Sequence, residues 1–402
     1  MVVSNVHGRQ WHFGEGLATS TASLGVCWDR LVEAFENTAP ESRNVQVLRG
    51  FLCKMHDRDR AVFERLLDEA MTRPSLVEWV PVLQLSAPLD ERGCDRLLAS
   101  MNNVNVPAWV FQHLGYGQVT KPVADDRLAE LLERLSIKPE GTKVAIDVLH
   151  MHVHGELMPV SARLTACAQT LICNAPLSRQ SHGLDHALST LVERFLQGHE
   201  AEPATRELLQ RFHEGIADYS VSRYDFTETL KALFQIQPLM ALDILIDGDE
   251  EMSEGYARRS VFAGGRRSSA LAAVPEQALL EWCRAGNGDR WARVTPLVPA
   301  FAPHESEAEL QWSSLAQALL RNAPDPVRVA EALVYVLVPT SWSGSRSEAI
   351  RRRLPLLDQL SDLLGPEHEG EVVEWRRKVT DLIEREAHHE RAEHQSRNER
   401  FE

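Results

Sequence analysis

One three-residue pattern recurs along the first third of the chain, and its spacing limits the folds that the sequence can adopt. An acidic residue, an arginine and an apolar residue follow one another at Asp29-Arg30-Leu31, Glu64-Arg65-Leu66, Asp95-Arg96-Leu97 and Asp126-Arg127-Leu128. Successive copies of this acid–Arg–apolar triplet start 35, 31 and 31 residues apart, and a fifth copy, Glu193-Arg194-Phe195, follows 67 residues later. A period in the low thirties is the length of one helix–turn–helix unit. Because such units bury their apolar faces only by stacking on neighbours, the triplet predicts an α-solenoid.

The residues around each triplet have the apolar spacing of a helix that is buried on one side. Around the first copy, Leu24, Trp28, Leu31, Val32 and Phe35 fall on one helical face. Shorter apolar stretches between the triplets are expected to form the second helix of each pair, at 45–55, 76–85 and 106–114. Prolines at positions 40, 74, 88 and 122 separate these segments. The alternative is chance similarity, since an acid and an arginine beside a buried leucine are common in amphipathic helices.

We therefore predict an all-α protein: an α-solenoid of stacked antiparallel helix pairs, HEAT-like or TPR-like, with a long C-terminal helix. The expected organisation is an N-terminal extension at 1–20, a helical-repeat array at 21–246, a charged surface loop at 247–275 and a C-terminal helical subdomain at 276–402. The last helix is expected between about residues 371 and 397. Its second half is almost wholly polar, so we expect it to extend into solvent, to fray or to pack on a polar partner.

Composition excludes several classes of function. The net charge of −15 argues against a general nucleic-acid binder and against binding to an anionic membrane surface. The sequence contains no apolar run of 18 residues and no secretory signal pattern, so no membrane contact is expected. The six cysteines form no CxxC pair and are expected to be reduced and buried, which favours the cytoplasm.

The clearest candidate for a metal site is the alternating cluster His150, His152 and His154. On a strand, all three imidazoles would point to one side and could hold Zn²⁺. On a helix, only His150 and His154 would share a face. The neighbouring segments are helical, so an ordinary set of half-buried histidines is the favoured interpretation. The cluster is kept as the basis of one alternative function, a metal-dependent enzyme.

A second candidate is the basic segment that carries Arg258, Arg259, Arg266 and Arg267 around Gly264-Gly265. It could bind phosphate or nucleic acid, with the glycines allowing close approach of the backbone. An acidic stretch precedes it, so a neutralised surface loop is the favoured interpretation. The other alternative function, a nucleic-acid-associated subunit, depends on this segment.

Sequence motifs for catalysis and for cofactor binding are absent. The chain has no GxxxxGK[ST] phosphate loop, no complete GxGxxG fingerprint and no GxSxG nucleophile elbow. We therefore expect no catalytic residues and no cofactor.

The C-terminal third resembles a known group of proteins. The segments that carry the resemblance are Ala323-Pro324-Asp325-Pro326-Val327, the loop from Pro339 to Arg346, Arg353-Leu354-Pro355-Leu356-Leu357 and the ending Arg397–Glu402. Over roughly residues 275–402 they resemble the C-terminal helical regions of large multidomain bacterial proteins, several of them anti-phage defence proteins of the STAND NTPase type. The resemblance implies a C-terminal fragment or a stand-alone relative of such proteins, in which the helical array is the sensing part. It carries over no catalytic residue.

The sequence as a whole predicts a non-catalytic, cytoplasmic interaction or sensor module. Helical arrays present extended surfaces that mostly bind proteins. The expected partner is therefore a protein, either phage-derived or another subunit of a defence complex.

Overall fold

The structure is a computed structural model that describes residues 9–155, 159–178, 183–221, 225–247, 269–286, 288–301, 310–339 and 342–399. In these ranges the chain is all-α, and the only extended pairing is a single bridge between Phe301 and Trp312. This confirms the predicted fold class, an α-solenoid-like stack of helices that ends in a long helix. The chain forms two compact units, Met1–Pro176 and Leu177–Glu402. The predicted charged loop at 247–275 lies mostly outside the described residues.

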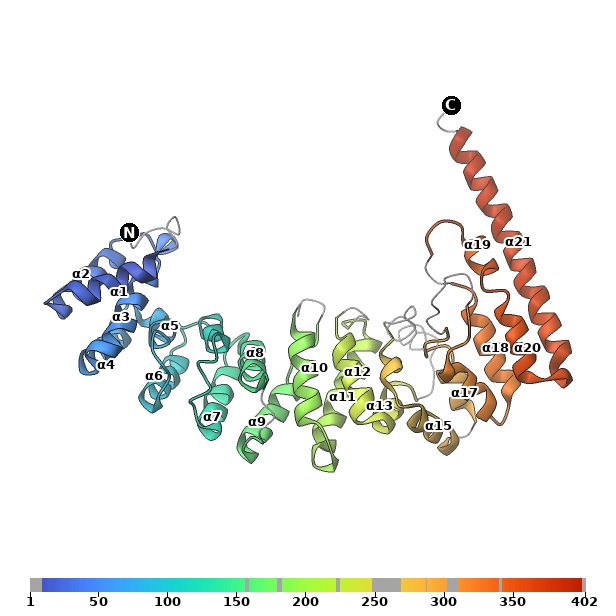
Figure 1. The fold of residues 1–402 in the computed structure, drawn as a ribbon, viewed down its shortest axis with the longest axis horizontal. Helices are drawn as coiled ribbons and strands as arrows, with labels where there is room; N and C mark the ends of the chain where they lie inside the picture. The colour runs from blue at the N-terminus through green and yellow to red at the C-terminus, as the bar shows by residue number, and fades with distance from the viewer. Residues whose placement is uncertain are drawn as a thin grey trace. The chain divides into compact units, whose positions relative to one another are not determined.

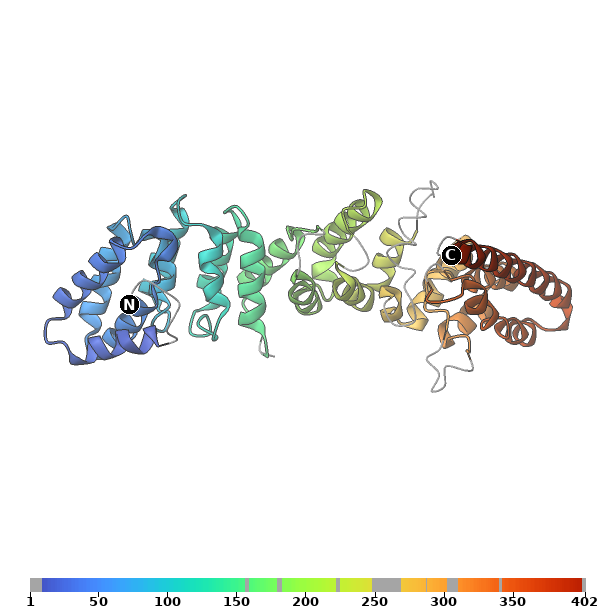
Figure 2. The ribbon, with the colours of Figure 1, turned by 90° about the horizontal axis from the view of Figure 1, so that it is seen from above.

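The N-terminal unit is a stack of short helices in which the main contacts join each helix to the next one or the next but one. The helices run side by side along the unit, coloured blue to green in Figures 1 and 2. Their bounds are α1 Gln10–Ser20, α2 Leu24–Glu36, η1 Pro40–Ser42, α3 Gln46–Arg58, α4 Arg60–Thr72, η2 Val77–Trp79, α5 Val80–Gln84, α6 Glu91–Asn102, η3 Ala108–Gly115, α7 Asp125–Ser136, α8 Gly141–Val153 and α9 Ala162–Cys173.

Two of the triplet helices, α4 and α6, begin at an aspartate that caps the first turn. Asp59 accepts a hydrogen bond from the backbone nitrogen of Val62 at 3.1 Å, and Asp90 accepts one from Gly93 at 2.8 Å. Such side chains satisfy backbone donors that have no partner within the first turn. The triplet helices α4, α6 and α7 then form one side of the unit, and α3, α5 and α8 form the other (Figure 1).

Two expected segments differ from the structure in detail. Residues 10–20, expected as part of an extension, form α1 and pack on α3. The amphipathic pattern is weak there because the buried residues of α1 are small, Gly14 and Ala18. The expected helix at 106–114 is a 3₁₀ helix, η3, that begins after the extended residue Pro107.

Ion pairs connect successive triplets. The acid of the second triplet, Glu64, accepts a hydrogen bond at 2.5 Å from Arg96 of the third, 32 residues later. The acid of the third triplet, Asp95, pairs with Arg127 of the fourth, again 32 residues later. In the fourth triplet, Asp126 accepts a hydrogen bond at 2.7 Å from the hydroxyl of Ser161, the residue that caps α9. From its second copy to its fourth, the triplet therefore joins one repeat to the next, at a step close to its period in the sequence.

The C-terminal unit is a second helical stack with a longer step. Side-chain contacts between its helices join residues about forty apart: Thr229 donates to Asp185 at 2.7 Å, Trp282 to Asp243 at 2.7 Å and Arg328 to Asp289 at 3.0 Å. The longer step explains why the triplet pattern fades beyond the N-terminal unit. The elements are α10 Leu184–Phe195, η4 His199–Ala201, α11 Glu202–Ala217, α12 Thr227–Ile236, α13 Pro238–Leu245, η5 Ala270–Ala273, α15 Glu276–Ala285, α16 Asp289–Val294, α17 Ser314–Asn322, α18 Pro326–Val336, α19 Arg346–Arg351, α20 Leu356–Leu364, η6 Pro366–His368 and α21 Glu369–Glu399.

The polar half of α21 begins by packing on α19. Glu386 pairs with Arg346 at 2.8 Å. Glu390 accepts hydrogen bonds from the hydroxyls of Ser345 at 2.8 Å and Ser347 at 2.7 Å, and from the backbone nitrogen of Ser347 at 3.0 Å. From 391 to 396 the side chains are exposed. The sequence left three possibilities for the polar half of α21: extension into solvent, fraying, or packing on a polar partner. Its first turns pack on the polar surface of α19.

This contact predicts an acid-sensitive attachment of α21. Burial alone would raise the pKa of Glu390, but hydrogen bonds from Ser347, Ser345 and the backbone of Arg346 outweigh it and lower the pKa to about 2 from the usual 4.5. A carboxyl whose pKa is lowered in the folded state stabilises that state above the unfolded pKa. The contribution should therefore be complete above pH 4.5, decline below it and vanish as the pH falls through about 2.

The check is the difference in melting temperature between the wild type and Glu390→Gln, measured as a function of pH. We expect the difference to be largest near pH 6 and to shrink towards zero at pH 2. Glu384→Gln, which changes an exposed neighbour on the same helix, should show no such trend. A difference for Glu390→Gln that does not depend on pH would contradict the assignment.

Candidate functional site

The histidine cluster does not converge, because its residues lie on a helix. His150 and His154 share one face of the C-terminal end of α8, with ring centres 5.7 Å apart. His152 is buried on another face, where its Nδ1 lies 3.1 Å from the hydroxyl of Thr120. Within the described ranges, no group of three His, Cys, Asp or Glu side chains could hold a metal ion. The strand-based arrangement of all three imidazoles on one side is therefore wrong.

The second predicted site, Arg258, Arg259, Arg266 and Arg267, lies outside the described residues and stays a prediction.

The buried cysteines are poor nucleophiles. Burial raises the pKa of Cys94 to about 11 and the pKa values of Cys167 and Cys283 to about 12. The thiolate is the nucleophilic form of cysteine, so these side chains stay protonated and unreactive near neutral pH. They serve as small apolar residues of the core.

The N-terminal unit holds a groove between η3 and α8. It encloses about 600 Å³, within the range of ligand pockets. Its lining is mainly apolar, with charged residues at one side: Val104, Val106, Pro107, Ala108, Trp109, Gln112, Lys138, Pro139, Glu140, Lys143, Val144 and Asp147.

Trp109 forms the aromatic wall of the groove on the η3 side. Its indole is 47% exposed and packs edge-on against Trp79, at 6.3 Å between ring centres. Trp79 in turn packs edge-on against Phe35 at 6.5 Å. Aromatic rings from three successive repeats, Phe35, Trp79 and Trp109, thus pack in a row. The packing holds Trp109 in place, and about half of Trp109 stays exposed to solvent.

The other wall is one face of α8. Glu140, Lys143, Val144 and Asp147 recur at the three- and four-residue steps that place side chains on one side of a helix. Burial raises the pKa of Asp147, and Lys143 partly opposes this effect.

A lysine in the turn between α7 and α8 holds one rim of the groove in place. The ammonium group of Lys138 donates hydrogen bonds at 2.9 Å to the backbone oxygens of Met101 and Asn103, at the C-terminal end of α6. Burial lowers the pKa of Lys138. A cation that satisfies the free carbonyls at a helix end fixes the local backbone, so this rim of the groove is preformed.

Large apolar side chains are exposed at and near this groove. Val104, on the rim, is 88% exposed, and Ile137, beside Lys138, is 77% exposed. Single exposed apolar residues are ordinary, but a group of them around an apolar hollow marks an interaction surface. Sequence reasoning missed this site because its residues come from segments that the apolar pattern assigns to the core.

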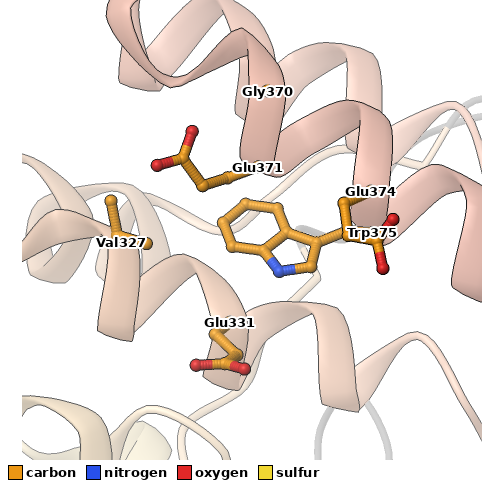
Figure 3. A pocket seen from close by; sticks show the side chains of 6 residues that line it. All are labelled: Val327, Glu331, Gly370, Glu371, Glu374 and Trp375. Carbon is orange, nitrogen blue, oxygen red and sulfur yellow. The ribbon is translucent and has the colours of Figure 1, made fainter.

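A shallower hollow lies in the C-terminal unit between α18 and α21 (Figure 3). It holds about 420 Å³ and is lined by Val327, Glu331, Gly370, Glu371, Glu374 and Trp375. Glu374 pairs with Arg377 at 2.8 Å, and Glu371 lies 3.8 Å from His368. The indole of Trp375 is buried. With little apolar surface available and two of its carboxylates engaged, this hollow is the weaker candidate.

No helix in the described ranges combines the length and apolar content that a membrane span requires. Comparison with protein-family models, with curated proteins and with solved structures finds no significant match to the chain.

Proposed function

We propose that this protein is a protein-interaction module whose N-terminal unit binds a segment of a partner protein in the groove between η3 and α8. The observation that carries the proposal is the apolar groove with a supported, half-exposed Trp109 and the exposed Val104 at its rim. Tryptophan is among the residues that contribute most to protein–protein binding, and a rigid, preformed pocket lowers the ordering cost of binding.

The chemistry of the lining favours binding over catalysis. The lining residues of the groove include no His, Ser or Cys that could act as a nucleophile or as a general base near neutral pH. Its charged groups, Lys138, Glu140, Lys143 and Asp147, stand at one side, as polar groups do at the rim of a protein interface. Nothing in the described residues favours the metal-dependent enzyme or the nucleic-acid-associated subunit.

The resemblance of the C-terminal third gives the biological setting of the proposal. In this setting the protein acts in the bacterial cytoplasm as the sensing part of an anti-phage defence system. Its partner is then a phage-derived protein or another subunit of the defence complex.

Val104→Glu tests the groove with little risk to folding, because the Val104 side chain is almost wholly in solvent. A carboxylate at the edge of an apolar contact must lose water when the partner binds, so we expect binding to weaken by about tenfold or more. The measurement is affinity capture of partners by the tagged chain from its host, with and without phage infection, followed by titration of the partner that is identified.

The matched control is Val26→Glu, the same change at an exposed position on α2. It should leave partner capture unchanged. Equal capture by the wild type and both variants would place the interaction elsewhere and remove the support for the groove.

A further inference from the structure

The hollow between α18 and α21 in the C-terminal unit has a lining that suits a positive charge. Three glutamates belong to the described residues that line it, and no lysine, arginine or histidine does. Glu331 comes from α18, and Glu371 and Glu374 come from α21. A hydrogen bond from Arg377 lowers the pKa of Glu374, so this carboxylate is charged at neutral pH. The hollow offers little apolar surface to a ligand, but its negative lining favours a cation.

The indole of Trp375 lies among these carboxylates and is a second feature that suits a ligand (Figure 3). Trp375 is only 7% exposed. The face of an indole ring attracts a cation, and the attraction is strongest where little water is present.

The N–H group of Trp375 is available to a ligand as well. In the same unit, Trp282 donates its N–H to Asp243 at 2.7 Å, and Trp312 donates to the backbone oxygen of Leu356 at 3.0 Å. Within the described ranges, the N–H of Trp375 has no such acceptor. Its nitrogen lies on the edge of the ring that faces Glu331 (Figure 3). A ligand oxygen, such as a peptide carbonyl, could accept this hydrogen bond.

The arrangement of the glutamates fits an organic cation better than a metal ion. In the part of the chain that the structure describes, no group of three His, Cys, Asp or Glu side chains could hold a metal ion, so the three carboxylates do not converge on one point. Carboxylates spread around an indole match the end of a lysine or arginine side chain. Such a chain can lie against the ring and pair with a carboxylate beside it.

An exposed aromatic side chain beside the hollow indicates that the ligand is part of a protein. Tyr335 follows Glu331 by one turn of α18 and is 82% exposed. Residues four apart lie on the same side of a helix, about 6 Å along its axis. A partner segment can cover Tyr335 and the hollow together, whereas a small polyamine has no apolar group to place on the tyrosine.

We propose that the hollow between α18 and α21 binds a lysine or arginine side chain of a partner protein, in a segment that also places an apolar residue against Tyr335. The net charge of −15 on the chain supports this choice, because it attracts a basic partner over a distance. The hollow is a second binding site, in the other unit of the chain, and it does not depend on the groove between η3 and α8.

Gly370 allows the hollow to be blocked without disturbing the fold. It lines the hollow on α21, and a Cβ atom at this position would meet nothing within 4 Å. Gly370→Arg would place a tethered guanidinium at the hollow, Gly370→Glu would add a carboxylate, and Gly370→Ala would add no charge. All three new residues are favoured over glycine inside a helix, so the melting temperatures should equal or exceed that of the wild type.

The experiment selects random twelve-residue peptides displayed on phage against the full wild-type chain and counter-selects against Gly370→Arg. Peptides that the wild type retains and Gly370→Arg loses should share a Lys or Arg and an aromatic or large aliphatic residue at constant spacing. Such a peptide should bind Gly370→Arg about tenfold more weakly than the wild type, Gly370→Ala equally and Gly370→Glu about twofold more tightly. Glu331→Gln, which leaves position 370 unchanged, should weaken binding about threefold.

The matched control is Gly16→Arg, the same change at an exposed glycine of α1 where a Cβ atom also meets nothing within 4 Å. It should leave binding of the selected peptides unchanged. Equal weakening by Gly16→Arg and Gly370→Arg would show a general effect of charge and would overturn the proposal. Peptides that lack a basic residue, or that bind Gly370→Glu as weakly as Gly370→Arg, would overturn it as well.

The selection also separates this site from the groove of the proposed function. Peptides that depend on the hollow should bind Val104→Glu as they bind the wild type. If no selected peptide is lost on Gly370→Arg while some are lost on Val104→Glu, the hollow is excluded and the groove remains.

Discussion

Replacing Arg96 by alanine should lower the free energy of unfolding of the N-terminal unit by about 3–5 kcal/mol, the range for removing one partner of a buried ion pair. Only 4% of the Arg96 side chain is exposed. Its guanidinium donates to Glu64 at 2.5 Å, to Asp68 at 2.8 Å and to Gln84 at 3.1 Å, and so joins α4, α5 and α6. Without Arg96, the buried carboxylate of Glu64 has lost its main counter-charge, and that desolvated charge is the source of the expected loss.

The second triplet supplies the matched control for this variant. Arg65 occupies the same place in its triplet, but its side chain is 60% exposed and lies 3.7 Å from Glu69. Arg65→Ala should therefore change the stability by less than about 1 kcal/mol. The double variant Arg96→Met/Glu64→Leu, which removes both charges, should recover most of the loss. Urea denaturation measures all three, and similar losses for Arg96→Ala and Arg65→Ala would contradict the role of the triplet as a joint between repeats.

Replacing Gly14 by alanine should cost about 3 kcal/mol or more, because α1 and α3 touch through their backbones at this point. A Cβ atom on Gly14 would lie 2.1 Å from the carbonyl oxygen of Val47 and 2.7 Å from the nitrogen of Phe51. The contact is reciprocal, since a Cβ on Gly50 would lie 2.0 Å from the carbonyl oxygen of Trp11. Neither backbone atom can move without displacing a helix, so α1 is expected to leave its place on α3.

Gly16 on the same helix is the control for this prediction. A Cβ on Gly16 would meet nothing within 4 Å. Alanine is favoured over glycine inside a helix by roughly 0.5–1 kcal/mol, so Gly16→Ala should be neutral or stabilising. Each variant adds one methyl group to the wild-type protein. Urea denaturation compares their stabilities, and hydrogen exchange in α1 gives a local readout. A loss for Gly14→Ala no larger than the effect of Gly16→Ala would show that α1 does not dock as described.

Much of the architecture could be predicted from the sequence because it depends on local patterns. Ser161 caps α9, Asp325 caps α18 with Pro326 as its first residue, and the last helix ends close to the expected position. These features follow from short-range rules for caps, prolines and apolar spacing. The triplet was also visible, but only the structure shows that the arginines of its third and fourth copies meet the acid of the copy before.

The candidate site could not be predicted because it depends on which faces meet. Arg65 and Arg96 stand in the same sequence context, yet one is exposed and the other is buried by neighbouring helices. Trp109 and Val106 belong to one apolar run, but only the stacking of η3 on α8 leaves Trp109 half exposed. The apolar periodicity of a sequence indicates which face of each helix is buried. It says little about the surface that forms where two repeats meet.

The most direct test of the groove is photo-crosslinking from position 104. Val104 would be replaced by the photoreactive residue benzoylphenylalanine, and Val26 on α2 would be replaced in the same way as the control. After irradiation in the host, with and without phage infection, we expect the partner to be covalently joined to the chain at position 104 and not at position 26. A partner that is captured by the tagged chain but never crosslinks at 104, or that crosslinks equally at 26, would contradict binding in the groove between η3 and α8.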